Sequence, residues 1–294
     1  MQRRLGPNKV GYLGLLQPFS DALKLILKEF VMPAHANKVL FLLAPVITLS
    51  TSLITWAVVP FGSGLILSDM EFGILYLLAV SSLGVYGVIG AGWSANSKYA
   101  FLGSLRSTAQ IISYEVIIGL VLLTVILLVG SLNLTDIVLS QLAIWYIIPL
   151  SPLALMFLIS ALAETNRAPF DLPEAESELV SGFFTEHSSL PFVLFFLSEY
   201  ASIILMSTLT SILFLGGYLS PFPTISNPTY FSLEALILGI KTCLILFIFI
   251  WIRASFPRFR FDQLMRFIWT GLLPVALAFI ILVPSILIAF DFSA

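Results

Sequence analysis

Long apolar stretches separated by short polar segments are the main pattern of this chain. A bilayer core of about 30 Å requires roughly 20 apolar residues in a helix that crosses it. Seven stretches have this length: residues 39–59, 72–93, 110–131, 143–163, 190–216, 233–252 and 267–290. We therefore predict an all-α fold, in which residues 1–294 form a single integral membrane domain with a polytopic bundle of about seven transmembrane helices.

Residues 18–32 predict a helix of a different kind, within a polar segment 1–38 that precedes the first span. At 100° per residue, polar and apolar side chains separate onto two faces. The polar face carries Ser20, Asp21, Lys24 and Lys28, and the apolar face carries Phe19, Ala22, Leu23, Ile26 and Phe30. This helix is too charged to span a membrane, so we predict that it lies in the interface. Packing on other loops is an equally compatible interpretation.

The positive charges show how the spans are oriented. Of the 14 Lys and Arg residues, all but Lys241 precede the first span or lie in a loop that follows an even-numbered span. They are Arg3, Arg4, Lys9, Lys24, Lys28, Lys38, Lys98, Arg106, Arg167, Arg253, Arg258, Arg260 and Arg266. With seven spans these positions share one side, which the positive-inside rule assigns to the cytoplasm or matrix. Only 10% of the residues are charged, against roughly 25% in soluble domains, which excludes a soluble globular protein.

Carboxylates accumulate in the loop after the fourth span. They are Glu164, Asp171, Glu174, Glu176, Glu178 and Glu186, with Glu199 in the next span, and Arg167 is the only cation among them. Like charges at this spacing raise one another's pKa values and favour shared protons. A solvated acidic loop is the alternative interpretation.

Four charged residues fall inside the predicted spans: Glu115, Glu199, Glu234 and Lys241. Each costs at least about 2.5–3.5 kcal/mol on insertion scales. So large a total predicts a polar, hydrated path through the bundle. Interhelical ion pairs that only fix the packing are the alternative.

Several kinds of chemistry are not expected of this chain. The single Cys243 and the two histidines, His35 and His187, do not form a metal, iron–sulfur or haem ligand set, and no phosphate-binding loop is present. Residues 253–266 alternate basic and aromatic side chains, which suits lipid headgroups, an acidic subunit, a ligand pocket or an ordinary positive-inside loop. Nucleic acid is not an expected partner, and no redox or hydrolytic reaction is expected of this chain alone.

Two long segments closely resemble the signatures of subunit 1 of NADH–ubiquinone oxidoreductase, respiratory complex I. The first is Gly92-Trp-Ser-Ala-Asn-Ser-Lys-Tyr through Ile-Ile-Ser-Tyr-Glu115, and the second is Ala163-Glu-Thr-Asn-Arg-Ala-Pro-Phe-Asp-Leu-Pro through Phe183. The flanking segments 2–8, 16–24 and 251–265 also match, so the resemblance covers essentially the whole chain.

The resemblance implies a core membrane subunit of this proton-translocating enzyme. Such a subunit forms part of the chamber for its substrate ubiquinone and couples quinone reduction to proton translocation. The implied partners are other membrane-arm subunits, quinone-site subunits of the peripheral arm and the lipid bilayer. The implied location is the mitochondrial inner membrane, with a bacterial plasma membrane as the alternative.

The resemblance also assigns roles to single residues. Those implied in proton coupling are Glu115, Glu164, Asp171, Glu174, Glu176, Glu178, Glu186, Glu199 and Lys241. Those implied at the quinone chamber or the docking surface are Tyr200, Arg258, Arg260, Asp262 and Arg167.

Three departures from the family pattern and two rival functions remain. The family normally has one more N-terminal span, Ala175 stands where Gly is frequent, and His187 stands where Tyr is expected. Beside Glu186, His187 could titrate near neutral pH or cap a helix. The rival functions are a stand-alone ion-coupled transporter and the membrane anchor of a related hydrogenase or plastid dehydrogenase complex.

Overall fold

The computed structural model describes residues 5–172, 182–220 and 231–290, and every regular element in these ranges is a helix. The α-helices are α1 (Gln17–Leu27), α2 (Lys38–Ile54), α3 (Gly73–Ser94), α4 (Lys98–Val129), α5 (Leu134–Ser140), α6 (Ser151–Glu164), α8 (Leu190–Phe214), α9 (Phe231–Ser255), α10 (Phe261–Arg266) and α11 (Leu273–Ala289). Short 3-10 turns occur at η1 (Tyr12–Gly14), η2 (Thr55–Val58) and η3 (Gly182–Phe184), and a π-helical turn, η5 (Phe267–Leu272), joins α10 to α11.

Six helices of the described ranges are long and apolar enough to cross a membrane. They are Lys38–Val58, Gly73–Ser94, Lys98–Val129, Leu190–Phe214, Leu233–Ser255 and Phe261–Ala289. A seventh apolar helix, Ser151–Glu164, has 14 residues and is shorter. The prediction of an all-α, polytopic bundle is confirmed, with six full-length helices and one short one in the described ranges in place of seven full-length spans.

The predicted fourth span, residues 143–163, was wrong over its first part. Residues 143–150 are not helical, and α6 begins at Ser151. Pro149 disfavours the helical conformation of the residue before it and donates no backbone N–H. Pro152 is tolerated, because it lies in the first turn of α6, where a donor is not needed. At 1.5 Å per residue α6 is about 21 Å long, shorter than the bilayer core.

The third span is longer than predicted, because α4 starts at Lys98 and not at residue 110. The Ser97 hydroxyl accepts a hydrogen bond from the Ala100 N–H and caps the helix. Lys98 and Arg106, which we expected in a loop, therefore lie on α4. The first three turns bury small side chains such as Ala100 and Ser104, and these carry too little hydropathy for the pattern to detect. The helix of 32 residues is about 48 Å long.

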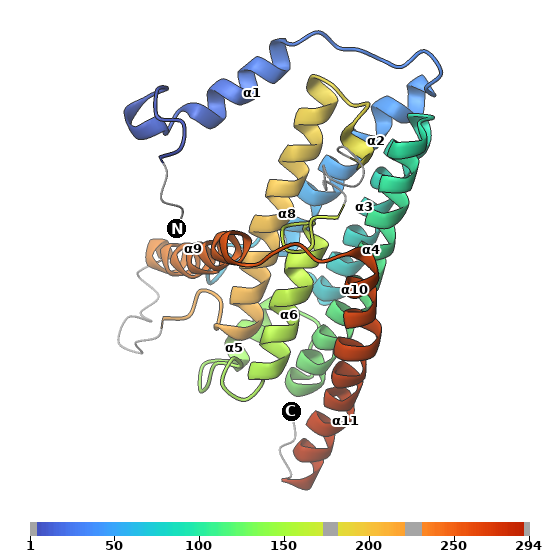
Figure 1. Cartoon of the computed structure of the whole chain (residues 1–294). Coiled ribbons are helices and arrows are strands. Elements are labelled where there is room, and N and C mark those ends of the chain that lie inside the picture. The colour runs from blue at the N-terminus through green and yellow to red at the C-terminus, as the bar shows by residue number, and fades with distance from the viewer. Residues whose placement is uncertain (1–4, 173–181, 221–230, 291–294) are drawn as a thin grey trace.

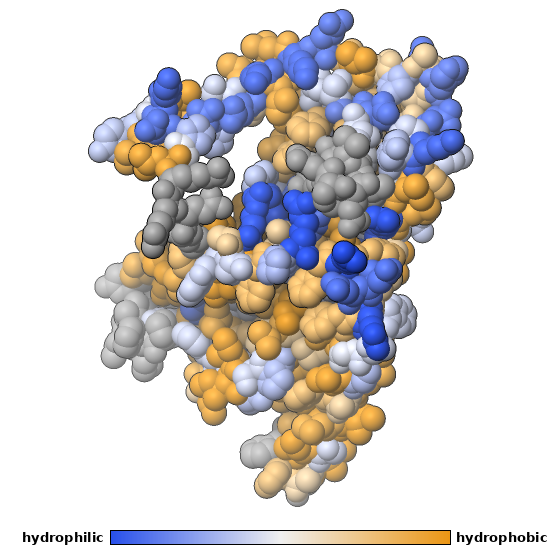
Figure 2. Space-filling model, in the orientation of Figure 1, coloured by the Kyte–Doolittle hydropathy of each residue, from blue (hydrophilic) through white to orange (hydrophobic). Residues whose placement is uncertain are grey.

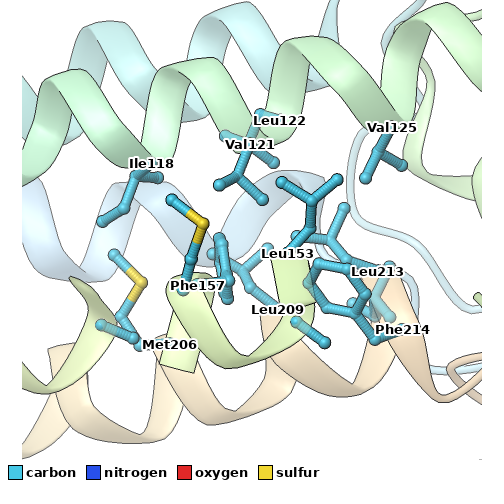
Figure 3. Packing of buried hydrophobic residues seen from close by; sticks show 14 of the residues in the cluster. Ile118, Val121, Leu122, Val125, Leu153, Phe157, Met206, Leu209, Leu213 and Phe214 are labelled. Carbon is cyan, nitrogen blue, oxygen red and sulfur yellow. The ribbon is translucent and has the colours of Figure 1, made fainter. Parts of the chain in front are cut away.

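Figure 1 shows α2, α3, α4, α6, α8 and α11 running in similar directions, with α9 lying across them and α1 beyond one end. Helix α2 packs against α3 and α8, and α4 packs against α3, α6 and α11. The main core forms where α4, α6 and α8 meet (Figure 3). Its labelled residues are Ile118, Val121, Leu122, Val125, Leu153, Phe157, Met206, Leu209, Leu213 and Phe214.

Helix α1 is amphipathic, as predicted, but ends at Leu27, where Lys28 turns to an extended conformation. None of its residues is buried, and its apolar side chain Phe19 is 73% exposed. An exposed apolar face agrees with a position in the interface, which stays a prediction. Hydrophilic residues cover much of the upper and middle part of the face in Figure 2, whereas its lower part is mainly hydrophobic.

Candidate functional site

A cavity of about 140 Å³ lies between α2, α3, α8 and the end of α6. Two of the predicted carboxylates, Glu164 and Glu199, line it. A single water needs roughly 10–15 Å³, so this cavity has room for several waters. We call it the hydroxyl cavity, because eight hydroxyl residues also line it: Thr48, Thr51, Ser52, Thr55, Ser81, Thr165, Ser198 and Ser202.

These eight hydroxyl groups all form the same kind of hydrogen bond. Each donates its proton to a backbone carbonyl three or four residues earlier in the chain, at 2.7–3.0 Å. The Ser81 hydroxyl, for example, donates to the Leu78 carbonyl at 3.0 Å. A hydroxyl that has donated its proton retains only acceptor lone pairs. The hydroxyl groups of the cavity wall therefore accept hydrogen bonds from water or from a protonated carboxyl group, whereas the Asn166 amide in the same wall can donate.

A second, smaller cavity of about 10 Å³ lies beside Glu115. Glu164, Ser81 and Met206 border both cavities. The small cavity has about the space that one water needs. Glu164 thus stands between a wider polar space that reaches Glu199 and a narrow one that reaches Glu115. Its Oε2 atom is buried without a hydrogen-bond partner among the described residues.

Glu199 is held by an ion pair with Arg167. The Arg167 Nε lies 2.9 Å from the Glu199 Oε1, and both side chains are 12% exposed. The guanidinium carbon of Arg167 also lies 4.8 Å from the centre of the Tyr200 ring, within cation–π distance. One arginine therefore joins the loop after α6 to two successive residues of α8.

The loop after α6 also contacts α4 and the segment between α9 and α10. The buried Gln110 side chain of α4 donates from its Nε2 to the carbonyls of Ala163 at 2.7 Å and Phe170 at 2.9 Å. On the other side, Arg258 lies 3.4 Å from Asp171. The Phe259 N–H donates to the Pro169 carbonyl at 3.0 Å. The segment between α9 and α10 thus packs on residues 165–172, the described part of the loop after α6, which we call the carboxylate loop.

The other predicted residues lie elsewhere. Arg260 and Asp262 are exposed at the start of α10, and Glu186 is half-buried after η3. Lys241 contacts backbone carbonyls at the end of α8. Glu174, Glu176 and Glu178 lie outside the described residues. Within the described ranges, no group of three or more His, Cys, Asp or Glu side chains could hold a metal ion.

His187 is buried in an aromatic environment, which corrects both expectations for it. Its ring stacks on Phe41 at 4.1 Å and meets Phe195 edge-on at 5.1 Å. Burial lowers the pKa of His187 to about 4, and an interaction with the Ala91 backbone acts in the opposite direction. The ring is therefore neutral at neutral pH. It does not cap α8, whose N-cap residue is Ser189.

The lowered pKa of His187 predicts a loss of stability in acid. Below its ordinary pKa of 6.5, the unfolded chain binds a proton that the folded chain rejects until about pH 4. Stability present above pH 6.5 is lost as the pH falls through this window, by about 1.4 kcal/mol per pH unit. The temperature of thermal inactivation should fall less steeply between pH 6.5 and pH 5 in His187→Phe. A matched His35→Phe variant at an exposed histidine should keep the original slope, and equal slopes in all three proteins would contradict this account.

Sequence reasoning missed two parts of this site. The hydroxyl residues of α2 and η2 at positions 48, 51, 52 and 55 recur at helical spacing, so a signal for the cavity wall was present. Gln110 is the first residue of the predicted span 110–131, and no role was predicted for it from the sequence. Its hydrogen bonds depend on the path of the chain after α6, and the sequence around Gln110 holds no information on that path.

Comparison with known proteins identifies the family. The family model described as NADH dehydrogenase matches residues 1–284. NADH-ubiquinone oxidoreductase chain 1 of Mycosarcoma maydis is 63% identical over 294 residues, which are 100% of this chain and 89% of the relative. The chain 1 protein of Chondrus crispus is 57% identical over 293 residues, 99% of this chain and 89% of the relative.

A bacterial relative matches equally well. This NADH-quinone oxidoreductase subunit of Rhodospirillum centenum is 57% identical over 296 residues, which are 99% of this chain and 86% of the relative. None of these three is named as a stand-alone transporter or a hydrogenase anchor. The chain therefore belongs to the NADH dehydrogenase family that contains oxidoreductase chain 1 and its bacterial counterpart, and it is a multi-pass membrane subunit of the mitochondrial or bacterial NADH–quinone oxidoreductase.

Proposed function

We propose that this subunit forms part of the ubiquinone chamber and couples quinone reduction to proton translocation through Glu199, Glu164 and Glu115. One observation carries the proposal: Glu164 borders both cavities, while Glu199 lines only the larger and Glu115 only the smaller. Three carboxylates in this order, joined by spaces that fit water, make a path for protons from the charged loop into the bundle.

The chemistry of the substrate supplies the driving force. A quinone that receives two electrons from a redox centre of another subunit takes up two protons and becomes a quinol. Removing protons from the carboxylate loop changes the charge beside Arg167 and Asp171. The Arg167–Glu199 ion pair joins that loop to α8. A change of charge in the loop therefore alters the proton affinity of Glu199. Water in the hydroxyl cavity then allows exchange between Glu199 and Glu164.

The proposed chamber wall includes Tyr200, Arg258, Arg260, Asp262 and Arg167. Tyr200 is 52% exposed and lies directly beside Glu199, against Arg167. Arg258, Arg260 and Asp262 are exposed on the segment that packs on the carboxylate loop. A basic surface beside the site suits the docking of peripheral-arm subunits, and ubiquinone would bind where those subunits meet this chain.

Glu115→Gln and Glu164→Gln should both uncouple the enzyme. The amide keeps the shape of each side chain but cannot release or bind the proton. Proton translocation linked to ubiquinone reduction should fall by about tenfold or more, since a positioned proton-transfer group contributes roughly 10²–10⁴-fold to a rate. Oxidation of NADH by a hydrophilic artificial acceptor, which bypasses the quinone site, should survive. Both activities are measured in membrane vesicles that contain the assembled complex.

Glu71→Gln is the matched control for these variants. Glu71 is an exposed carboxylate in the loop before α3, on the side of the membrane without positive charges, and it lines neither cavity. Its substitution should leave both activities unchanged. Undiminished translocation per NADH in the assembled Glu115→Gln and Glu164→Gln complexes would rule out the proposed path.

A further inference from the structure

Helix α8 is followed by a turn that favours glycine at two positions. Gly216 and Gly217 have φ angles of +71° and +49°, in the left-handed region. A Cβ atom on Gly216 would lie 2.9 Å from the Trp145 Nε1, and one on Gly217 would lie 2.8 Å from a methyl group of Val138. The turn redirects the chain beyond Leu215, and it brings the carbonyls of residues 215, 217 and 219 to a common point.

The last carbonyls of a helix lack partners within the helix, and here other parts of the chain supply them. The Ile212 carbonyl accepts from the Gln141 Nε2 at 2.8 Å, and the Phe214 carbonyl accepts from the Ile147 N–H at 2.9 Å. The next carbonyls are satisfied by one side chain of α9. The Lys241 Nζ donates to Leu215 at 2.6 Å, Gly217 at 2.8 Å and Leu219 at 2.7 Å.

All hydrogen-bond donors of the charged Lys241 side chain are therefore used. Its ammonium group has three N–H donors, and each has a carbonyl partner. The Trp145 ring adds a cation–π contact at 4.6 Å, and the residue is only 7% exposed. No ion pair within the described ranges joins Lys241 to a carboxylate. The partial negative charge at the C-terminus of α8 also favours a positive charge at this position.

We infer that Lys241 is a permanent cation that positions α9 on the end of α8, and that it does not exchange protons during turnover. A neutral amine here would lose one donor and turn a lone pair towards a carbonyl oxygen. Helix α9 lies across the other long helices and packs mainly on α8, so few other contacts fix its position. A second polar contact on α9 supports this role: Glu234 accepts hydrogen bonds from the N–H and the hydroxyl of Ser63, at 2.6 and 2.7 Å.

Chemical rescue tests whether the proton of Lys241 moves. Lys241→Ala removes the ammonium and leaves a space lined by carbonyls, and NADH–ubiquinone reductase activity of the assembled complex should fall by about tenfold. Ethylamine, 2-methoxyethylamine and 2-fluoroethylamine have decreasing pKa values, and all are protonated at neutral pH. Each should restore activity, and at saturation all three should restore it to the same level. Restored rates that follow the pKa of the amine would overturn the inference, as would full activity of the alanine variant without any amine.

Lys241→Arg gives an independent test, because a guanidinium keeps its charge and does not release a proton in proteins. The assembled arginine variant should translocate the same number of protons per NADH as the unmodified complex. Normal ubiquinone reduction with fewer translocated protons would show that Lys241 is a proton carrier. Lys9→Ala, at an exposed lysine, controls for the loss of a positive charge, and the unmodified complex controls for effects of the amines.

Only the translocation measurement rests on the proposed function. If the subunit does not couple protons, Glu115→Gln and Glu164→Gln will translocate normally, whereas the alanine variant will still respond to amines. If Lys241 is a proton carrier, the glutamine variants will be uncoupled and the rescued rates will depend on the pKa of the amine. The two failures therefore give different results.

Discussion

Replacing Arg167 with methionine should destabilise the folded subunit by about 3–5 kcal/mol, the usual cost of removing one partner from a buried ion pair. Glu199 would then keep a charge at a site where its side chain is only 12% exposed. The contact with the Tyr200 ring would be lost as well. The expected measurement is a lower temperature of thermal inactivation and less assembled complex on native gels.

The double variant Arg167→Met, Glu199→Gln decides whether the ion pair causes this effect. Neutralising Glu199 removes the uncompensated charge, so the double variant should recover a large part of the lost stability. It should still be defective in proton translocation, because Glu199 belongs to the proposed path. A double variant no more stable than Arg167→Met alone would show that the arginine acts through other contacts.

Gly103→Val should prevent normal packing of α4 against the segment that contains η3. A Cβ atom on Gly103 would lie 2.7 Å from the Gly182 Cα and 2.9 Å from the Phe183 nitrogen. Both atoms belong to the backbone, so relief requires the chain itself to move. Overpacking of this kind typically costs about 1–3 kcal/mol, and a branched side chain should reach the upper end of that range or beyond. The amount of assembled complex and its rate of ubiquinone reduction should both fall.

Gly119→Val is the matched control on the same helix. A Cβ atom at Gly119 would meet no atom within 4 Å, so added methyl groups have space. Valine should be tolerated there, and its higher helix propensity than that of glycine offers a small gain. Equal losses in Gly103→Val and Gly119→Val would mean that glycine is needed for helix flexibility and not for close packing.

The helices that face lipid could be predicted from hydropathy, because an apolar exterior leaves a continuous signal along the chain. This was sufficient for α2, α3, α8 and α11. It failed at residues 143–150, where apolar side chains belong to a non-helical segment that packs on the end of α8, with the Ile147 N–H donating to the Phe214 carbonyl. It also failed at the start of α4, where burial depends on small side chains and not on strongly apolar ones.

The sequence was sufficient to predict which charged residues belong to the site, but not which partners they contact. The charges inside the spans suggested either a polar path or structural ion pairs, and the structure contains features of both. Glu115 and Glu164 line cavities, whereas Glu199 lines a cavity and also pairs with Arg167. The partners of Lys241 could not be predicted, since backbone carbonyls occur at every residue and only the glycine turn after α8 selects three of them.

The hydroxyl groups around the larger cavity have a consequence for which ions could enter it. Every one of the eight hydroxyl groups has turned its proton towards its own helix, so these groups present oxygen lone pairs to the cavity. Among the described residues that line the cavity, the Asn166 amide offers N–H donors to chloride or another anion, and the hydroxyl groups offer none. The same wall suits hydronium and water that donates its protons. The cavity should therefore admit chloride much less readily than water or hydronium, which helps the membrane to keep its electrical potential while protons move.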